Sequence, residues 1–204
     1  MGFWEVFYAS WQMECCGTPF SVGEEVSWPL MFSSSGELLD GGWHEELAKL
    51  VGPVERLPGR SLRFLREESG LTVALGGDLG AEAVSEDGSI RLVGMLLVER
   101  HGSDWPQAGG KVGAVRVVTQ EYEEKVPGSR SWTPVREPGA RRLRSVDTCP
   151  KWFERGTVDE RGRRAMEEGV LVTLEVPSGA PEGTADAADG AADAAGGSPR
   201  PAVP

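Results

Sequence analysis

Phe20-Ser21-Val22-Gly23-Glu24-Glu25-Val26-Ser27-Trp28 is the most regularly patterned stretch of this 204-residue chain. Apolar side chains alternate with polar ones both before and after a central Gly-Glu pair. A period of two places alternate side chains on the same face of a strand, and a glycine beside an acidic residue favours a turn. The pattern therefore predicts extended chain that bends sharply into a strand. Pro29 follows directly and should limit how far that strand pairs, because proline has no backbone N–H to donate.

A glycine and an acid followed by alternating valine and tryptophan often open a small barrel of the SH3-like type. In such barrels a later Gly-x-Val strand packs against the opening strand, and residues 51–57 have that pattern. Aromatic and β-branched residues, which favour strands, also dominate several other runs. We expect strands over residues 3–11, 71–75, 90–100, 113–123, 141–146 and 170–176. The runs 90–100 and 113–123 flank a Gly/Pro loop and predict an antiparallel hairpin.

Two segments have helical features. Trp43, Leu47, Leu50 and Val51 share one face at helical spacing, so residues 42–51 are expected to form a short helix, although a strand starting at Val51 remains an alternative. Residues 159–168 contain good helix formers after Asp159, a candidate N-cap. The predicted fold class is therefore mainly β (a β-rich α+β domain), with an antiparallel, partly barrel-like sheet and one or two short helices.

The composition divides the chain at residue 176. Residues 1–176 contain the aromatic side chains and are expected to form a single globular domain, whereas residues 177–204 are rich in Ala, Gly, Pro and Asp and contain no aromatic residue. A segment of that kind buries too little apolar surface to offset the entropy of ordering it. We therefore predict a disordered tail over residues 177–204.

Charge and cysteine content restrict the partners and the compartment. The formal net charge is −11 at pH 7, which repels phosphate backbones and anionic lipid headgroups, so nucleic acid and membranes are not expected partners. No apolar run is long enough to span a bilayer. Three cysteines, two of them adjacent, do not suggest a disulfide framework and favour reduced thiols in a cytoplasmic protein.

The tryptophans of the first half provide candidate ligand-binding residues. An SH3-like barrel binds its partners in an aromatic groove, and Trp11, Trp28 and Trp43 are the candidates for such a groove here. The competing interpretation is that these side chains fill the core, where most large aromatic residues are found.

Cys15, Cys16, His44 and Cys149 have the side-chain types of a tetrahedral zinc site. Their spacing matches no known zinc ribbon or finger, and adjacent cysteines in an extended chain point apart. Cys15 or Cys16 as a nucleophile requires a base, for which the sequence offers His44 and His101. The alternative in each case is that these cysteines are structural thiols without a cofactor.

Residues 7–23, from Phe7-Tyr8-Ala9-Ser10-Trp11 through Cys15-Cys16-Gly17-Thr18-Pro19 to Gly23, resemble the N-terminal signature of an uncharacterised actinobacterial family, domain of unknown function 6578. Residues 147–153, Asp-Thr-Cys-Pro-Lys-Trp-Phe, are similar to a C-terminal counterpart. The resemblance covers about residues 3–176 and implies neither an activity nor catalytic residues, but it implies an actinobacterial cytoplasm as the setting.

The sequence thus contains no assembled catalytic motif. We expect a non-enzymatic binding or interaction module of the bacterial cytoplasm, with an unidentified protein or small molecule as its partner. The alternative is a cysteine- or metal-dependent enzyme that uses the Cys15/Cys16 loop. That alternative requires Cys15 or Cys16 to lie within ligand or hydrogen-bond reach of His44, His101 or Cys149.

Overall fold

A computed structural model describes residues 1–34, 38–56, 62–76, 88–101, 105–126 and 128–177. Within these ranges the chain forms ten strands, one α-helix and one 3-10 helix. In chain order they are β1 (Gly2–Ala9), α1 (Ser10–Cys16), β2 (Glu25–Ser34), η1 (Leu38–Asp40), β3 (Ala48–Arg56), β4 (Arg63–Arg66), β5 (Thr72–Leu75), β6 (Ser89–Val98), β7 (Gln107–Glu124), β8 (Trp132–Pro134), β9 (Arg141–Val146) and β10 (Arg163–Val176). No helix in the described ranges has the length and apolar character needed to cross a membrane.

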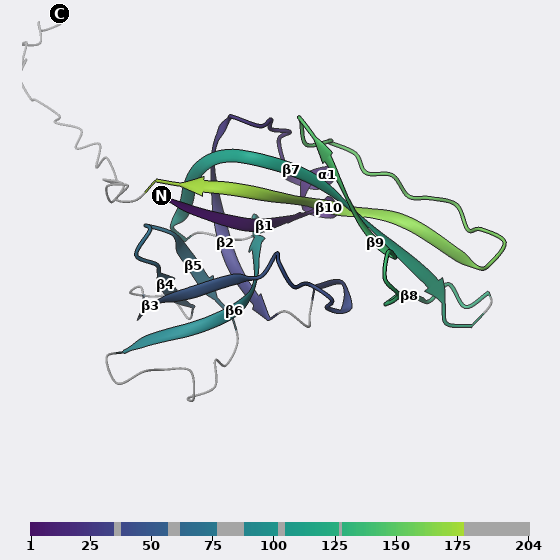
Figure 1. The fold of residues 1–204 in the computed structure, drawn as a ribbon, viewed down its shortest axis with the longest axis horizontal. Coiled ribbons are helices and arrows are strands. Elements are labelled where there is room, and N and C mark those ends of the chain that lie inside the picture. Colours follow the sequence, from purple (N-terminus) through teal and green to yellow (C-terminus); the bar gives the residue numbers. More distant parts are fainter. Residues whose placement is uncertain (35–37, 57–61, 77–87, 102–104, 127, 178–204) are drawn as a thin grey trace, which may run out of the picture.

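Eight of the described strands close into a barrel in the order β10–β1–β6–β3–β4–β5–β2–β7 (Figure 1). The antiparallel pairing of β7 with β10 joins the two ends of this series. Most neighbouring strands are antiparallel, but β1 runs parallel to β6 and β2 runs parallel to β5. Closure leaves these eight strands without a long free edge. The predicted mainly β, barrel-like fold is therefore confirmed.

The interior of the barrel is filled by alternate side chains of its strands. On β10, Val170, Val172, Leu174 and Val176 belong to the central core cluster, whereas Leu171 faces the outside of the barrel wall. A second core covers this wall at Leu171, whereas Thr173 and Glu175 on the same outer face are polar. The predicted strand over residues 170–176 is confirmed, and it lies between β1 and β7.

The second core lies on the outer face of the barrel under residues 38–47. Its buried members are Phe7, Trp43, Met95, Val118 and Leu171. The guanidinium of Arg141 stacks 4.1 Å from the centre of the Trp43 ring. The same guanidinium donates hydrogen bonds to the carbonyls of Gly41 and Leu39, so Arg141 fixes this segment against β9.

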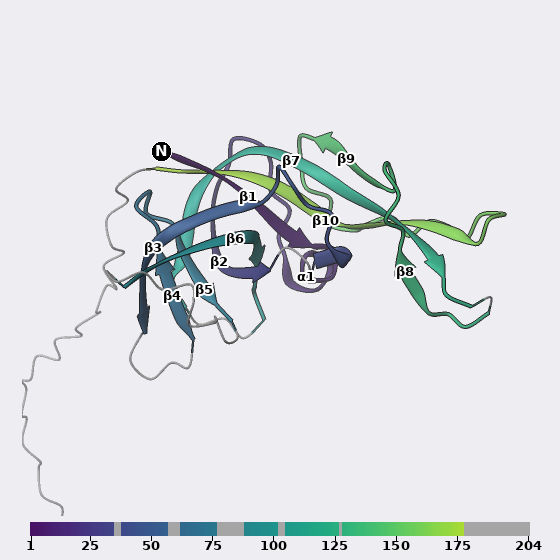
Figure 2. The same ribbon diagram turned by 60° about the horizontal axis from the view of Figure 1, so that its bottom comes forward.

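Two of the strands extend past the barrel as an arm, which Figures 1 and 2 show at the right of the molecule. Residues 119–123 of β7 pair with residues 163–167 of β10, and β8 and β9 add to the other edge of β7. Several arginines on this arm pair with glutamates, and two others stack on tryptophans. Examples are Arg142–Glu121 at 3.2 Å, Arg144–Glu167 at 2.8 Å and Arg163–Glu137 at 2.9 Å.

Both predicted helices are wrong. Residues 48–51 belong to β3, in which Ala48 and Leu50 are buried while Lys49 and Val51 are exposed. This period-two burial is that of a strand, although the spacing from Trp43 to Val51 also fits a helix. Residues 163–168 begin β10, because pairing with β7 overrides the helix propensity of their side chains. The predicted N-cap, Asp159, instead accepts hydrogen bonds from the backbone N–H groups of Arg161 and Arg163 in a turn.

Three further details of the predicted pairing also require correction. Residues 90–100 and 113–123 do not form a hairpin, since β6 pairs with β1, β2 and β3, and β7 pairs with β2, β8, β9 and β10. Residues 51–56 pair with β4 and β6 rather than with β2. The strand predicted over residues 3–11 ends at Ala9, and residues 10–16 form α1 where an irregular loop was expected around Cys15 and Cys16.

The decisive stretch at residues 20–28 forms as predicted. Gly23 has a φ of +92° in the turn, and β2 follows from Glu25. The ladder of β2 with β7 ends at Pro29, after which the same strand continues with β6 and β5 as its partners. The predicted disordered tail lies outside the described residues, except for Pro177.

Candidate functional site

A thiol–imidazole cluster lies where α1 and the segment after β6 meet. Sγ of Cys15 is 3.6 Å from Nε2 of His101, and Sγ of Cys16 is 3.9 Å from the same nitrogen. The three ligand atoms lie within 4.8 Å of one another, and all three residues are exposed. Parallel pairing of β1 with β6 explains this meeting, because α1 follows β1 and His101 follows β6 at the same end of the barrel.

Gln12 holds the two segments of the cluster together. Its buried side-chain amide donates a hydrogen bond of 2.8 Å to the carbonyl of Val98, and its side-chain carbonyl accepts one of 2.8 Å from the backbone N–H of Arg100. The Gln12 side chain thus satisfies the carbonyl of Val98 and the N–H of Arg100, the two residues that flank Glu99. The position of His101 relative to α1 is therefore set by a buried contact rather than by surface side chains.

The chain can turn directly after Cys16 because residue 17 is glycine. A Cβ at Gly17 would lie 2.5 Å from Sδ of Met13 and 2.7 Å from the hydroxyl oxygen of Tyr8, closer than any real contact. The end of α1 is also capped from outside the helix. Nζ of Lys151 donates to the carbonyls of Met13 at 2.7 Å and Gly17 at 3.0 Å, which places a positive charge at the negative end of the helix.

Trp11 contacts the imidazole of His101, and Glu99 holds the backbone of the same residue. The ring centres of Trp11 and His101 are 4.7 Å apart with an interplanar angle of 32°. The backbone N–H of His101 donates to the carboxylate of Glu99 at 2.7 Å. Trp11 remains 52% exposed, so its ring shields one face of the imidazole while the thiols stay open to solvent.

The electrostatics of the cluster do not activate a nucleophile at Cys16. Although Cys16 is exposed, partial desolvation of its thiol raises the pKa above its ordinary value, and the adjacent Cys15 thiol raises it further. Reactive cysteines have a lowered pKa because the thiolate is the nucleophile. Two sulfurs and one imidazole nitrogen are instead a ligand set suited to a thiophilic metal ion.

The structure brings together only part of the predicted metal set. Cys15 and Cys16 are in the cluster, but the third member is His101 rather than His44 or Cys149. His44 is exposed on the segment before β3. Cys149 is buried, its Sγ lies 3.5 Å from the carbonyl oxygen of Pro150, and burial raises its pKa to about 12. Cys149 is therefore a structural thiol.

The three predicted groove tryptophans do not share a surface. Trp28 is buried inside the barrel, where it packs against Phe20 and Tyr8 with ring centres 4.9 and 5.6 Å away. Trp43 is buried in the outer cluster. Trp11 is exposed on α1, in contact with His101. No property of the sequence separates these three positions, because alternation alone does not say which layer covers a strand.

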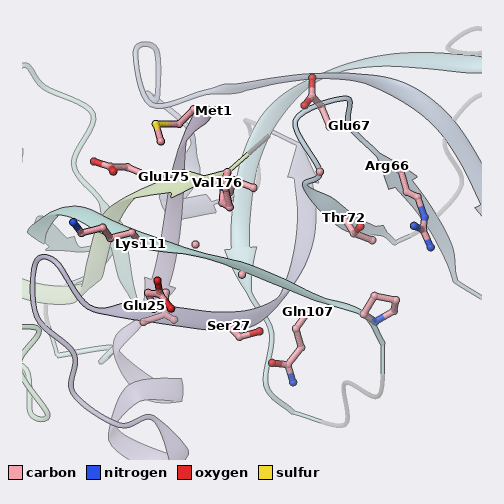
Figure 3. Close-up of a pocket in the computed structure, with 16 residues that line it drawn as sticks. Met1, Glu25, Ser27, Arg66, Glu67, Thr72, Gln107, Lys111, Glu175 and Val176 are labelled. Atoms are coloured by element: carbon pink, nitrogen blue, oxygen red, sulfur yellow. The ribbon is translucent and has the colours of Figure 1, made fainter. Parts of the chain in front are cut away.

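A wide pocket opens at the opposite end of the barrel, where β1 begins and β10 ends. It has a volume of about 1120 Å³ and is lined by residues from the starts of β1, β2 and β7, the turn between β4 and β5, and the end of β10. Figure 3 shows Lys111, Glu25 and Glu175 on one side of this pocket and Arg66 and Thr72 on the other. Sequence reasoning missed the pocket, because its lining comes from five separate segments.

Charge and bare backbone define the character of this pocket. Lys111 on β7 is directly opposite Glu25 on β2 and Glu175 on β10, so the cation lies between two carboxylates. Gly109 leaves the neighbouring backbone of β7 without a side chain, whereas Gly110 makes room for β10, because a Cβ there would lie 2.7 Å from the carbonyl oxygen of Glu175. Glycine within a strand often marks a place where a ligand or another backbone approaches closely. The pocket therefore offers both charged groups and peptide groups to a ligand.

The fold and the two sites define a class: a closed β-barrel with a polar pocket at one end and a thiol–imidazole cluster at the other. The chain belongs to a family of unknown function, DUF6578, whose model matches residues 2–176. The family resemblance seen at residues 7–23 is thereby confirmed. No curated protein and no solved structure gives a significant match to the chain.

Proposed function

We propose that this protein is a non-enzymatic binding module of the bacterial cytoplasm, and that its ligand occupies the pocket at the open end of the barrel. The observation that carries the proposal is the pocket itself. Its volume of about 1120 Å³ lies just above the range of about 300–1,000 Å³ that is usual for small-molecule sites. The described lining contains neither cysteine nor histidine, which supports binding rather than chemistry at this end.

The charges of the pocket favour a neutral or cationic ligand, either a small molecule or a peptide segment. Three carboxylates, those of Glu25, Glu67 and Glu175, line the pocket against two cations, Lys111 and Arg66. The guanidinium of Arg66 is 3.3 Å from the carboxylate of Glu55, which offsets part of its charge. The net charge of −11 for the whole chain acts in the same direction and disfavours nucleic acid.

The cytoplasmic setting is supported by the thiols. Cys15 and Cys16 are exposed and adjacent, and no disulfide involves them or Cys149. Exposed thiol pairs persist in a reducing compartment and are oxidised outside it. A measurement of free thiols in protein isolated directly from cells tests this part of the proposal.

The ligand proposal is tested by filling the pocket. The nearest non-neighbouring atom to a Cβ at Gly109 is the carbonyl oxygen of Val26 at 3.9 Å, so Gly109→Phe adds a ring at the pocket wall without a backbone clash. Gly76→Phe is the matched control, because its nearest atom is Sδ of Met31 at 3.8 Å and Gly76 does not line the pocket. Both variants of the full chain are compared with the wild type.

The assay is thermal denaturation in the presence of a panel of amines, amino acids and short basic or neutral peptides. A ligand at 100 times its Kd stabilises the folded protein by about 2.7 kcal/mol, which raises Tm by about 5–10 °C for a domain of this size. We expect wild type and Gly76→Phe to respond to the same compounds and Gly109→Phe not to respond. Equal responses in Gly109→Phe, or no response of the wild type to any compound, would contradict the proposal.

A second candidate function, an enzyme that uses Cys15 and Cys16, is favoured by one observation: the distance of 3.6 Å between the Cys15 thiol and the His101 imidazole. It requires a thiol that reacts with iodoacetamide much faster than free cysteine at neutral pH. The raised pKa of Cys16 works against that role for Cys16. Ordinary alkylation rates at both thiols would eliminate this candidate.

A further inference from the structure

We propose that Cys15, Cys16 and His101 form a zinc site, in which two thiolates and Nε2 of the imidazole bind Zn²⁺ and solvent completes the coordination. The site lies at the opposite end of the barrel from the pocket, so this inference is independent of the proposed ligand. It replaces the sequence-based set that contained His44 and Cys149.

The distances between the ligand atoms match those of a tetrahedral site. With Zn–S near 2.3 Å and Zn–N near 2.0–2.1 Å, tetrahedral angles separate a sulfur from a nitrogen by about 3.6 Å. The observed separations from Nε2 of His101 are 3.6 Å to Sγ of Cys15 and 3.9 Å to Sγ of Cys16. Both sulfur-to-nitrogen separations are therefore within a few tenths of an ångström of those in a zinc site.

The two halves of the site are held in place before any ion binds. Gln12 bonds the backbone of Val98 and Arg100 from within α1, and this contact is buried. The ring of Trp11 stacks on His101 from the same helix. A site whose ligands are already positioned loses little entropy on binding, and its supporting contacts contribute to metal affinity.

The helix also overcomes the objection that adjacent cysteines diverge. In a strand, successive side chains point to opposite faces, but at the last two positions of α1 the thiols of Cys15 and Cys16 lie 3.6 and 3.9 Å from Nε2 of His101. Gly17 then takes the chain away where any larger residue would contact Met13 and Tyr8. The segment Cys15-Cys16-Gly17 is thus built to present two sulfurs to one point.

The ligand types select the metal. Thiolate and imidazole together favour zinc over magnesium or calcium, which prefer oxygen ligands. Binding releases the two thiol protons to solvent, and the two thiolates then neutralise the charge of Zn²⁺. A zinc ion with three protein ligands has one open coordination position, which a water molecule fills.

The test is metal titration of the purified full-length chain, kept reduced with a phosphine. Co²⁺ serves as the spectroscopic probe, since thiolate ligation gives a sulfur-to-metal charge-transfer band and tetrahedral geometry gives strong visible bands. Zn²⁺ affinity is then measured by competition with a chromophoric chelator. We expect one equivalent of Co²⁺ to give both features and one equivalent of Zn²⁺ to displace it.

Four single variants assign the ligands. Cys15→Ala, Cys16→Ala and His101→Ala should each weaken Zn²⁺ binding by more than about 100-fold, since even loss of a supporting contact costs about 10–100-fold. His44→Ala is the matched control and should bind as the wild type does. Circular dichroism checks that each variant is folded, which is expected because all four side chains are exposed.

Three outcomes would overturn the proposal. One is the absence of a charge-transfer band at one equivalent of Co²⁺ in the reduced wild-type protein. Another is binding of one equivalent of Zn²⁺ with the affinity of the wild type in both Cys15→Ala and Cys16→Ala. Loss of binding in His44→Ala with retention in His101→Ala would also contradict it, and would restore the histidine considered from the sequence.

Discussion

Replacing Gln12 with methionine tests the contact that joins α1 to the end of β6. Methionine has nearly the same volume, so the change leaves no large cavity and removes only the polar groups. The carbonyl of Val98 and the N–H of Arg100 each lose a hydrogen bond of 2.8 Å at a side chain that is only 3% exposed. An unsatisfied buried group costs about 1–3 kcal/mol, so we expect a loss of about 3 kcal/mol of unfolding free energy.

That loss corresponds to a fall in Tm of about 6–12 °C for a domain of this size. Urea denaturation followed by tryptophan fluorescence should show a lower midpoint with an unchanged m-value, because the folded state buries the same surface. His44→Ala, an exposed position, should stay within about 0.5 kcal/mol of the wild type. A loss below about 1 kcal/mol in Gln12→Met would refute the reasoning that this amide connects the two elements.

Three further outcomes are expected from other parts of the molecule. Iodoacetamide should modify Cys15 and Cys16 in the native protein and Cys149 only after denaturation, because Cys149 is buried and its pKa is raised to about 12; mass spectrometry counts the adducts. Gly169→Ala should destabilise the fold by more than about 3 kcal/mol in urea denaturation, since φ is +148° and a Cβ would lie 2.2 Å from a carbonyl oxygen of β1. Burial raises the pKa of Glu168, so folding favours the protonated carboxyl over the carboxylate. The stability that Glu168 contributes is therefore greatest below its pKa in the unfolded chain, and it is lost as the pH rises through its pKa in the folded protein. Glu168→Gln should therefore raise Tm at about pH 8 and have little effect near pH 4, and an equal change at both would contradict this assignment.

Local sequence pattern was sufficient to predict a strand that pairs with neighbours on both of its edges. Residues 170–176 were predicted as a strand from their apolar and β-branched side chains, and they pair with β1 and β7. Residues 159–168 were predicted as a helix, because their Arg, Met and Glu side chains favour one. Residues 163–167 are a strand only because they pair with the part of β7 that extends into the arm. The sequence did contain the alternation of Ala48 and Leu50 that is typical of a strand. The prediction instead followed the helical spacing that includes Trp43, and so it was wrong.

The candidate sites depend on topology that no local signal carries. Cys15 and His101 are 86 positions apart, and they meet because β1 and β6 are parallel neighbours whose carboxyl ends lie together. With two histidines in the sequence, nothing local distinguished His101 from His44. The pocket is equally non-local, since residues as distant as Glu25 and Glu175 face one another only across Lys111.

The pairing of the first strand with the last has a consequence for how the chain folds. Gly2 is opposite Val176 and Ala9 is opposite Gly169, so β1 gains its antiparallel neighbour only after nearly the whole described chain has been synthesised. On a ribosome adding about 5–20 residues per second, β1 waits roughly ten seconds or more with one edge unpaired. Contacts of such high sequence separation slow folding, and an unpaired apolar edge invites association between nascent chains. Truncations that remove residues from β10 should therefore yield aggregates rather than a smaller folded domain.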